Sequence, residues 1–292
     1  MDGVRLVPPV VSAIDDLRQR IASARAECRR VGFVPTMGAL HAGHASLVER
    51  ARQESSFVVV SIFVNPTQFG PREDFTRYPR TLEADLAICD RAGADLVWHP
   101  TVDVMYPPGD QTIVEVPRLG RVLEGEVRPD HFRGVATVVT KLLMAVVPDV
   151  AFFGQKDFQQ QLLIRTMVRD LFLPFEITTC PTTREEDGLA LSSRNRYLSP
   201  SERLAARSLS QAIFHLRDRL LAGASDLPKL VAETLSRLRS TPLVNPDYLV
   251  VADPGTLAPL ETVQKEMVAL VAARVGTTRL IDNCLVSCTS SN

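Results

Sequence analysis

The chain has 292 residues, of which 45% are hydrophobic and 23% are charged, and both values are ordinary for a globular protein. Its 33 basic and 34 acidic residues give a formal net charge of −1, which argues against a nucleic-acid or membrane-surface partner. No apolar run reaches the about 18 residues that a membrane-spanning helix needs, and Met1 to Arg5 lack the pattern of a secretory signal.

The cysteines point to the same class of protein. The chain has five of them, an odd number, scattered at positions 28, 89, 180, 284 and 288. This usage favours reduced thiols over a disulfide framework. We therefore expect a cytoplasmic protein with one large α/β domain and a smaller second domain.

Apolar, β-branched runs alternate with helical stretches through the first part of the chain. The pattern predicts strands at 31–34, 57–64, 96–98, 150–153 and 175–179, and helices at 46–54, 81–92, 135–147 and 157–171. This alternation predicts an α/β fold, a Rossmann-like doubly wound parallel sheet with helices on both faces. In such sheets ligands bind beyond the carboxyl ends of the strands.

The pattern changes after Arg184. Ser199 to Glu202 is a capping box with proline at the first helical position, so a helix is expected from there to about Leu221. A second helix is expected at 226–238 and a strand at 247–251, and segments 263–271 and 278–281 complete a helix-and-strand unit. We expect two domains, 1–182 with the ligand site and a smaller α+β domain, 183–292, that closes over it.

The segment from Pro35 to Val48 is the most informative for function. It joins a buried strand to a helix through a glycine-containing turn, which is how α/β sheets build phosphate sites. His41 and His44 lie three positions apart at the entrance of that helix, so two imidazoles can face one reacting phosphate. By itself a His-x-x-His pair is more often a chance surface feature. A zinc site would need a third ligand that the other histidines and the cysteines do not offer in a recognisable spacing.

Two further turns follow predicted strands. Asn65-Pro66-Thr67-Gln68 comes directly after the most apolar strand, and its plain interpretation is a turn in which Asn65 caps its own backbone. The second turn, Gly154 to Asp157, follows the strand predicted at 150–153. There Asp157 and Gln160 have the spacing of a capping box, whereas Lys156 is well placed to pair with a polyphosphate.

A polar loop precedes the capped helix. Asp187 to Asn195 contains two serines followed by Arg194, and it is either an exposed interdomain loop or a mobile phosphate clamp. For Asp85 the sequence allows two interpretations. It is either an acid on the helix surface or a carboxylate that approaches Mg²⁺-bound phosphates.

Together these segments resemble the pantoate–β-alanine ligase family of the nucleotidylyltransferase superfamily. Gly32 to His44 is similar to the His-x-Gly-His element, and Phe63 to Phe69 is similar to the family's Phe-Val-Asn-Pro-x-Gln-Phe motif. Leu191 to Arg194 resembles the counterpart of a Lys-Met-Ser-Lys-Ser element. Gln155 departs from the family, which usually carries glutamate there. The likeness covers about residues 32 to 200, with a weaker likeness through 278–283, and Cys284 to Asn292 looks like an extension past the usual end.

The resemblance implies which residues form the site. His44, His41 and Lys156 are implied to be catalytic, Gln68 and Gln160 to bind pantoate, and Gln68 also to place β-alanine. The segment 123–135 is expected to border the pantoate pocket. The implied ATP contacts are Met37, Gly38, Ala39, Leu40, His41, Ala42, Gly43, His44, Gly154, Gln155, Lys156, Asp157, Thr183, Leu191, Ser192, Ser193 and Arg194.

The implied reaction is a two-step ligation with MgATP. Pantoate attacks the α-phosphorus to give a pantoyl adenylate and pyrophosphate, and β-alanine then displaces AMP. The family also implies a homodimer. Two alternatives remain open, another adenylyltransferase of the same fold and a non-catalytic nucleotide-binding module. An adenylyltransferase whose second substrate is a phosphate ester would need a phosphate-recognising pocket, and the neutral Gln68 and Gln160 do not suit one.

Overall fold

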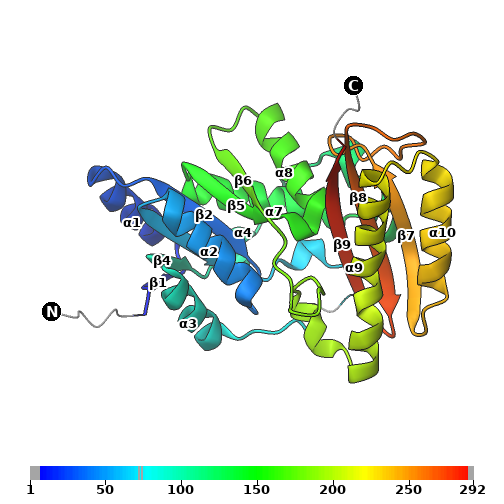
Figure 1. Cartoon of the computed structure of the whole chain (residues 1–292). Coiled ribbons are helices and arrows are strands. Elements are labelled where there is room, and N and C mark those ends of the chain that lie inside the picture. Colours follow the sequence, from blue (N-terminus) through cyan, green and yellow to red (C-terminus); the bar gives the residue numbers. More distant parts are fainter. Residues whose placement is uncertain (1–6, 72, 74, 289–292) are drawn as a thin grey trace. The chain divides into compact units, whose positions relative to one another are not determined.

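The computed structural model describes residues 7–71, 73 and 75–288, and its ribbon is drawn in Figure 1. The chain forms two compact units. The first unit comprises Met1–Gly154 and Gln159–Pro181, and the second comprises Gln155–Phe158 and Thr182–Asn292. The short segment 155–158 therefore packs with the C-terminal part of the chain, although it follows a strand of the first unit.

A six-stranded sheet forms the centre of the first unit. Its strands lie in the order β1-β4-β3-β2-β5-β6, and every neighbouring pair is parallel. The strands are β1 (Val10–Val11), β2 (Val31–Thr36), β3 (Phe57–Ile62), β4 (Leu96–Trp98), β5 (Val150–Gly154) and β6 (Glu176–Cys180). All six residues of β3 are buried, as its uniformly apolar sequence predicts for a central parallel strand.

Helices cover both faces of this sheet. They are α1 (Ile14–Ala26), α2 (Ala42–Glu54), α3 (Leu82–Ala92), α4 (Val102–Met105), α5 (Pro117–Gly120), α6 (Glu124–Val127), α7 (His131–Val146) and α8 (Phe158–Asp170), with a short 3₁₀ turn η1 (Pro66–Gln68). The 3₁₀ turn η2 (Gln155–Asp157), between β5 and α8, belongs to the second unit. α2 packs on α3 and on β2, β3 and β5, whereas α1 packs on α7. The predicted Rossmann-like, doubly wound sheet is confirmed.

The strand order reverses direction between β2 and β5. These strands are neighbours, with Gly32 opposite Val150, but the chain leaves β2 toward β3 on one side and β5 toward β6 on the other. Such a reversal separates the two crossover helices and opens a crevice at the carboxyl ends of the two strands. β2 ends at Thr36, just before the His41 segment, and β5 ends at Gly154.

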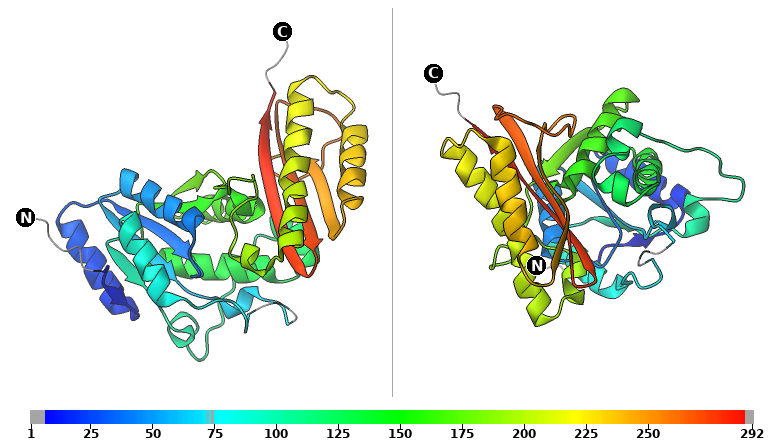
Figure 2. Two further views of the ribbon diagram at one scale, coloured as in Figure 1. Left: turned by 60° about the horizontal axis from the view of Figure 1, so that its bottom comes forward. Right: turned by 90° about the vertical axis from the view of Figure 1, so that its right-hand side faces the viewer.

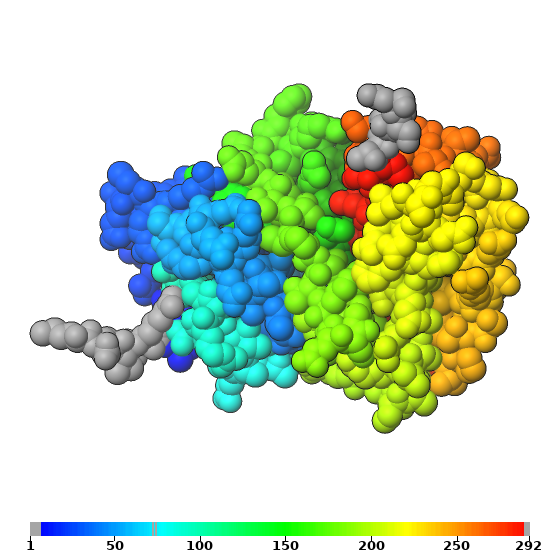
Figure 3. Space-filling model, viewed as in Figure 1, coloured from blue at the N-terminus to red at the C-terminus, as the bar shows by residue number. Residues whose placement is uncertain are grey.

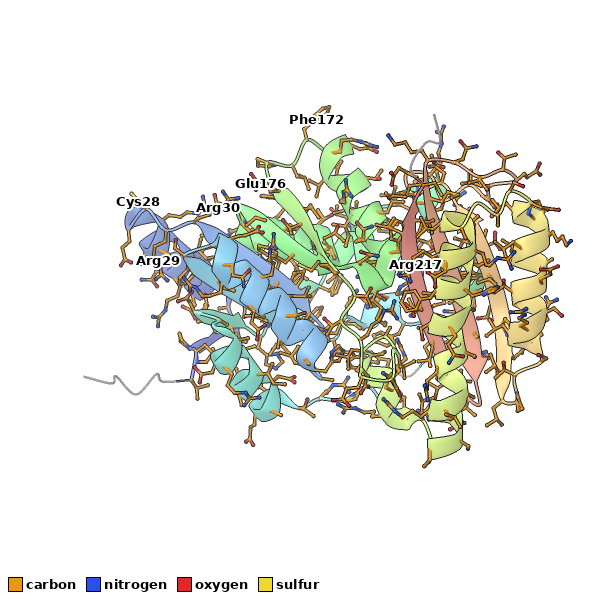
Figure 4. The ribbon with its side chains drawn as sticks, viewed as in Figure 1. Cys28, Arg29, Arg30, Phe172, Glu176 and Arg217 are labelled. Atoms are coloured by element: carbon orange, nitrogen blue, oxygen red, sulfur yellow. The ribbon has the colours of Figure 1, made fainter. Side chains whose placement is uncertain are left out.

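The opposite, amino edge of the sheet is held by ion pairs. Arg30 and Glu176 point toward each other across the start of β5, with 2.5 Å between guanidinium nitrogen and carboxylate oxygen (Figure 4). Asp95 accepts hydrogen bonds from Arg29 and Arg52 at 3.0 and 2.7 Å. These charged groups join neighbouring segments at the amino edge of the sheet.

Some predicted boundaries were wrong. α2 begins at Ala42 rather than Ser46, and α7 begins at His131 rather than Val135. β3 ends at Ile62, two residues before the predicted end, because the chain turns into η1. The predicted helix at 157–171 is divided into η2 and α8. β1 and α1 were not predicted.

The second unit is an antiparallel sheet with two helices. β7 (Val244–Ala252), β8 (Glu266–Val275) and β9 (Thr278–Ser287) form the sheet in that order. α9 (Pro200–Leu221) packs on β8 and β9, and α10 (Leu227–Arg239) packs on β7 and on α9, so both helices lie on one face (Figure 2). Their outer sides form a continuous surface, yellow to amber in Figure 3. η3 (Ser193–Tyr197) precedes α9.

The capping box at the start of α9 is present as predicted. The Ser199 side chain accepts from the backbone of Glu202, and the Glu202 carboxylate accepts from the N–H of Ser199 at 2.8 Å. The C-terminal prediction was wrong in one respect, because the segment 263–271 contributes only to a strand, β8. Cys284, where the extension was expected to begin, is a buried residue of β9. Residues 289–292 lie outside the described part of the chain. Within that part, none of the helices is both long and apolar enough to span a membrane.

Candidate active site

The first turn of α2 places His41 and His44 side by side. His41 is the N-cap residue, and its Nδ1 accepts a hydrogen bond from the N–H of Gly43 at 3.1 Å. Nδ1 of His44 accepts from the N–H of His41 at 3.4 Å, and the two ring centroids are 4.1 Å apart. A neutral imidazole whose Nδ1 accepts carries its proton on Nε2. Both rings therefore carry an Nε2–H donor at a helix N-terminus, where the dipole favours anions.

The turn before these histidines is shaped by left-handed backbone and a buried carboxylate. Gly38 and Ala39 have φ values of +80° and +51°. Asp85, which is 1% exposed, accepts from the N–H groups of Ala39 and Leu40 at 3.0 and 2.8 Å. Neither sequence interpretation of Asp85 was right, since it is neither on the helix surface nor open to a ligand. Its charge is used inside the fold to hold the turn.

Gln68 is the last residue of η1, and it is buried. Asn65 donates through Nδ2 to Oε1 of Gln68 at 3.2 Å, and the Gln68 amide nitrogen donates to the sulfur of Met37. Asn65 Oδ1 also accepts from the N–H of Thr67, so the predicted cap is present. These contacts join η1 to the Met37 turn, within one unit.

The start of α7 holds η1 from the other side. A Cβ on Gly134 would lie 2.4 Å from the carbonyl oxygen of Thr67, so only glycine permits this close approach. Nδ1–H of His131 donates to the carbonyl of Gln68 at 2.8 Å, because Nε2 of the same ring accepts from Arg128 at 3.1 Å. Arg128 also forms a two-point ion pair with Glu73 at 2.7 and 2.6 Å.

The electrostatics of this group follow from burial and from Arg128. Burial, helped by the neighbouring guanidinium, lowers the pKa of His131 from 6.5 to about 4, so the ring is neutral at physiological pH. Burial opposes ionisation of Glu73, but the hydrogen bonds and charge of Arg128 outweigh it and hold the pKa of Glu73 below 4.5. Within the 123–135 segment, Glu126 and Arg133 are exposed, whereas Glu124 is buried and Arg128 and His131 are half-buried.

Gln160 lies in the first turn of α8 and is half-buried. Its side-chain amide has no hydrogen bond to another described residue, in contrast to that of Gln68. Gly154, at the end of β5, has open space where a Cβ would be. Both positions belong to the first unit, at the carboxyl edge of its sheet.

The turn η2 carries Lys156 and belongs to the second unit. The Lys156 ammonium is 3.8 Å from the carboxylate of Asp157, whose side chain is 47% exposed. The Asp157 carboxylate does not form the capping box with Gln160 that the spacing allowed. Gln155 donates through Nε2 to Oδ1 of Asn283 at 3.3 Å.

The Thr183–Arg194 segment also belongs to the second unit. The N–H of Leu191 donates to the carbonyl of Thr183 at 3.0 Å, which closes the intervening loop. Ser192 is the N-cap of η3, and its hydroxyl accepts from the N–H of Arg194 at 3.3 Å. Ser192, Ser193 and Arg194 are all half-buried. Two hydroxyls and a guanidinium on one short turn are donors of the kind that bind phosphate.

The predicted site residues fall into two sets by unit. The first unit holds Met37 to His44, Gln68, Gly154 and Gln160, and the second holds Gln155 to Asp157, Thr183 and Leu191 to Arg194. Among the described residues, no three His, Cys, Asp or Glu side chains gather as a metal site.

A family model named pantoate-beta-alanine ligase matches residues 9–285 of the chain. The chain belongs to the pantoate–β-alanine ligase family. The resemblance drawn from the motifs is confirmed, and the chain is an enzyme of the ligase class.

Curated relatives of this ligase agree over nearly its whole length. The chain is 54% identical over 284 residues to the pantothenate synthetase of Stutzerimonas stutzeri, a match that covers 97% of this chain and 99% of the relative. It is 51% identical over 277 residues to the pantothenate synthetase of Roseiflexus sp., covering 95% and 99%.

Solved structures of the family share the fold. Pantothenate synthetase from Thermus thermophilus superposes with a TM-score of 0.90 at 49% identity, covering 94% of this chain and 98% of that one. The pantoate-beta-alanine ligase of Francisella tularensis, solved with beta-gamma ATP and beta-alanine, gives a TM-score of 0.76 at 33% identity, covering 95% and 97%.

Sequence reasoning missed the residues that hold these turns. Asp85, Arg128 and His131 had only vague roles, and Arg184 and Asn283 had none. A signal was present for some of them. Asp282-Asn283 is a polar pair between the apolar residues Leu280-Ile281 and Cys284 to Val286, and such a pair is tolerated in a core only when it is hydrogen-bonded.

Proposed function

We propose that the chain condenses pantoate with β-alanine at the expense of MgATP, through a pantoyl adenylate, releasing AMP and pyrophosphate. Family membership over residues 9–285 supports the overall reaction. The observation that carries the mechanism is the pair of Nε2–H donors at the start of α2, since both Nδ1 atoms are used by backbone N–H groups.

In the first step the carboxylate of pantoate attacks the α-phosphorus and pyrophosphate leaves. Negative charge builds up on the phosphate oxygens, so fixed donors lower the barrier more than covalent help would. His41 and His44 donate to those oxygens in this proposal, and His44 is the proton donor. The backbone from Met37 to His44 approaches the nucleotide.

The second unit supplies the remaining phosphate contacts in this proposal. Lys156 pairs with the phosphates as a point charge, and Ser192, Ser193 and Arg194 donate hydrogen bonds to them. Thr183 contacts ATP through its backbone, and Gly154, Gln155 and Leu191 border it. Mg²⁺ enters as part of the substrate MgATP, and the exposed carboxylate of Asp157 suits an ion that keeps most of its water and phosphate ligands.

Pantoate is placed by two neutral amides. Gln160 offers two N–H donors and an acceptor to a hydroxy acid, and Gln68, which already bonds Asn65 and Met37, has one N–H and one lone pair left for it. Holding the pantoate carboxylate in line with the α-phosphorus would account for a large part of the rate acceleration. Gln160 keeps its amide unpaired within the described residues, which suits direct contact with a substrate. In the second step the amine of β-alanine, placed near Gln68, attacks the acyl carbon and AMP leaves.

The labelling pattern of the products tests this mechanism. With ¹⁸O in both carboxylate oxygens of pantoate, one labelled oxygen should appear in AMP after the β-alanine step, because the bridging oxygen leaves with the phosphate. A route through an acyl phosphate would place the label in inorganic phosphate and yield ADP. Detection of ADP as the nucleotide product would overturn the proposal.

We also propose that the chain is a homodimer, as its family resemblance implies, and that it is cytoplasmic, as its scattered cysteines indicate. Light scattering should then give about twice the protomer mass of 32.2 kDa. A mass of one protomer at micromolar concentration would contradict the dimer, with no consequence for the reaction.

A further inference from the structure

Asn283, in β9, holds the turn that carries Lys156. Its Nδ2 donates to the carbonyls of Gln155 and Lys156 at 2.9 and 2.8 Å, and its Oδ1 accepts from the side chain of Gln155 at 3.3 Å. Asn283 is 2% exposed. Both N–H donors and one of the two oxygen lone pairs of the Asn283 side chain are therefore bonded to groups of η2. The backbone on which the Lys156 ammonium is mounted is fixed by a residue 127 positions away.

The preceding residue, Asp282, holds the other predicted phosphate-binding segment. It is 3% exposed, and its two oxygens accept from Arg184 at 2.7 and 2.9 Å. Arg184 stands at the base of the Thr183–Arg194 segment, where its backbone pairs with Ala190 and its guanidinium donates to the carbonyl of Gly188 at 3.1 Å. The two-point geometry fixes the plane of the guanidinium as well as its distance.

An aromatic ring of α9 supports the same guanidinium. Arg184 lies 4.6 Å from the ring centroid of Phe214, and Arg217, labelled in Figure 4, lies 4.6 Å from the same centroid. Successive residues of a strand point to opposite faces of the sheet. Asp282 therefore engages Arg184 on the α9 side while Asn283 engages η2 on the other.

We propose that Asp282 and Asn283 are positioning residues that mount the Lys156 turn and the Thr183–Arg194 segment on one strand. The inference rests on the proposed function, since it takes both segments to bind the phosphates of ATP. Arg184 and Asn283 then set the spacing between the lysine and the serine–arginine donors before ATP arrives. A preset spacing spares the enzyme the entropy of ordering two loops on each turnover.

The full-length Asn283→Ala variant tests the first part of the proposal, the hold of Asn283 on the Lys156 turn. It removes both donors to η2, and the KM for ATP in pyrophosphate release should rise, or kcat fall, by about tenfold to a hundredfold, as for a small displacement of a reacting group. The KM for pantoate should change little. Thr234→Val is the matched control, because it deletes another buried hydrogen bond of the second unit, to Leu230 at 2.8 Å, far along the chain from either segment. Thermal melts followed by circular dichroism show whether each variant is folded.

A double-mutant cycle separates positioning from general stabilisation. If Asn283 acts through the lysine, then in a Lys156→Ala background the Asn283→Ala change should alter the single-turnover rate less than about threefold, because the two residues share one effect. Losses that simply multiply would overturn the inference. Arg184→Lys tests the second part and does not depend on Asn283→Ala folding. It keeps the charge but loses the planar fork, and it should also raise the KM for ATP.

Binding of ATP alone separates this inference from the proposed function. If the wild-type protein binds ATP but forms no pyrophosphate with pantoate, the proposed reaction is refuted. The positioning role of Asp282 and Asn283 can then still be tested by ATP binding. Calorimetry should then still show weaker ATP binding by folded Asn283→Ala than by wild type. Equal ATP affinities would overturn positioning whatever the reaction is.

Discussion

Replacement of Asp85 by asparagine should loosen the turn that leads into His41 and His44, the histidines of the proposed active site. One carboxylate oxygen accepts from the N–H of Ala39 at 3.0 Å, and the other accepts from the N–H of Leu40 at 2.8 Å and the hydroxyl of Thr81 at 3.1 Å. Asparagine has the same shape but only one oxygen. Its NH₂ group would face the N–H of Ala39 or Leu40, donor against donor, in a place that water does not reach.

The size of the effect follows from these contacts. A hydrogen bond to a charged group contributes about 1.5–3 kcal/mol, and leaving its buried N–H partner unsatisfied costs about 1–3 kcal/mol. Removing the cost of burying a charge offsets part of this loss. We expect Asp85→Asn to lower the free energy of unfolding by about 3 kcal/mol. Thr81→Val, which deletes one neutral donor to the same carboxylate, should cost about 1 kcal/mol.

Urea unfolding followed by tryptophan fluorescence measures both values. The chain has one tryptophan, and Trp98 is fully buried in β4 of the unit that contains Asp85. Pyrophosphate release at a temperature where Asp85→Asn is folded should also show a raised KM for ATP, because the turn precedes His41 directly. If Asp85→Asn were as stable as wild type, or no less stable than Thr81→Val, the role given to the buried carboxylate would be refuted.

Three further outcomes test the site. His44→Ala should lose about 2–4 kcal/mol of transition-state stabilisation in single-turnover adenylate formation, with the circular dichroism spectrum retained, and near-normal turnover would rule out its role. Gln160→Ala should weaken pantoate binding in calorimetry and spare ATP binding, whereas the reverse result would mean that the two pockets are exchanged. His131 has a pKa of about 4 when folded and 6.5 when unfolded, so the unfolded chain binds more protons between these values. The free energy of unfolding should therefore decrease by about 2 kcal/mol when the pH is lowered from 6.5 to 5. A His131→Asn variant that loses the same amount over this range would contradict the assignment to His131.

Local signals in the sequence were sufficient for much of the fold. β4 and α9 have the predicted bounds or nearly so, because a buried apolar run and a capping box are readable over a few residues. The start of α2 was placed four residues late because histidine is not among the usual N-cap residues, yet His41 caps that helix. β8 was not recognised as purely strand, since a continuous apolar run such as Met267 to Ala273 has no period to distinguish strand from helix.

The residues proposed for the site were recognisable in the sequence because they lie in short motifs. His41 and His44 share one motif, as do Ser192 and Arg194. The residues that hold these motifs come from far away: Asp85 bonds a turn 45 positions earlier, and Asn283 bonds one 127 positions earlier. A single sequence carries no record of such contacts, and a buried Asp or Asn looks the same as an exposed one until the fold is known.

These distant residues share an electrostatic logic. His131 and Asn283 both donate to backbone carbonyls, those of Gln68, Gln155 and Lys156. An unpaired carbonyl oxygen beside a polyphosphate would repel it, so a donor that occupies each carbonyl makes the turn less repulsive to an anion. At the start of α2 the N–H groups of His41 and Gly43 donate to imidazole Nδ1 atoms. Each ring is thereby polarised by the helix N-terminus and presents an Nε2–H donor, which lies farther from the backbone than an amide N–H does. In the proposed reaction such a side chain, unlike a backbone amide, would also give up its proton to the leaving oxygen, and this would account for histidine at a position where serine or aspartate would cap the helix better.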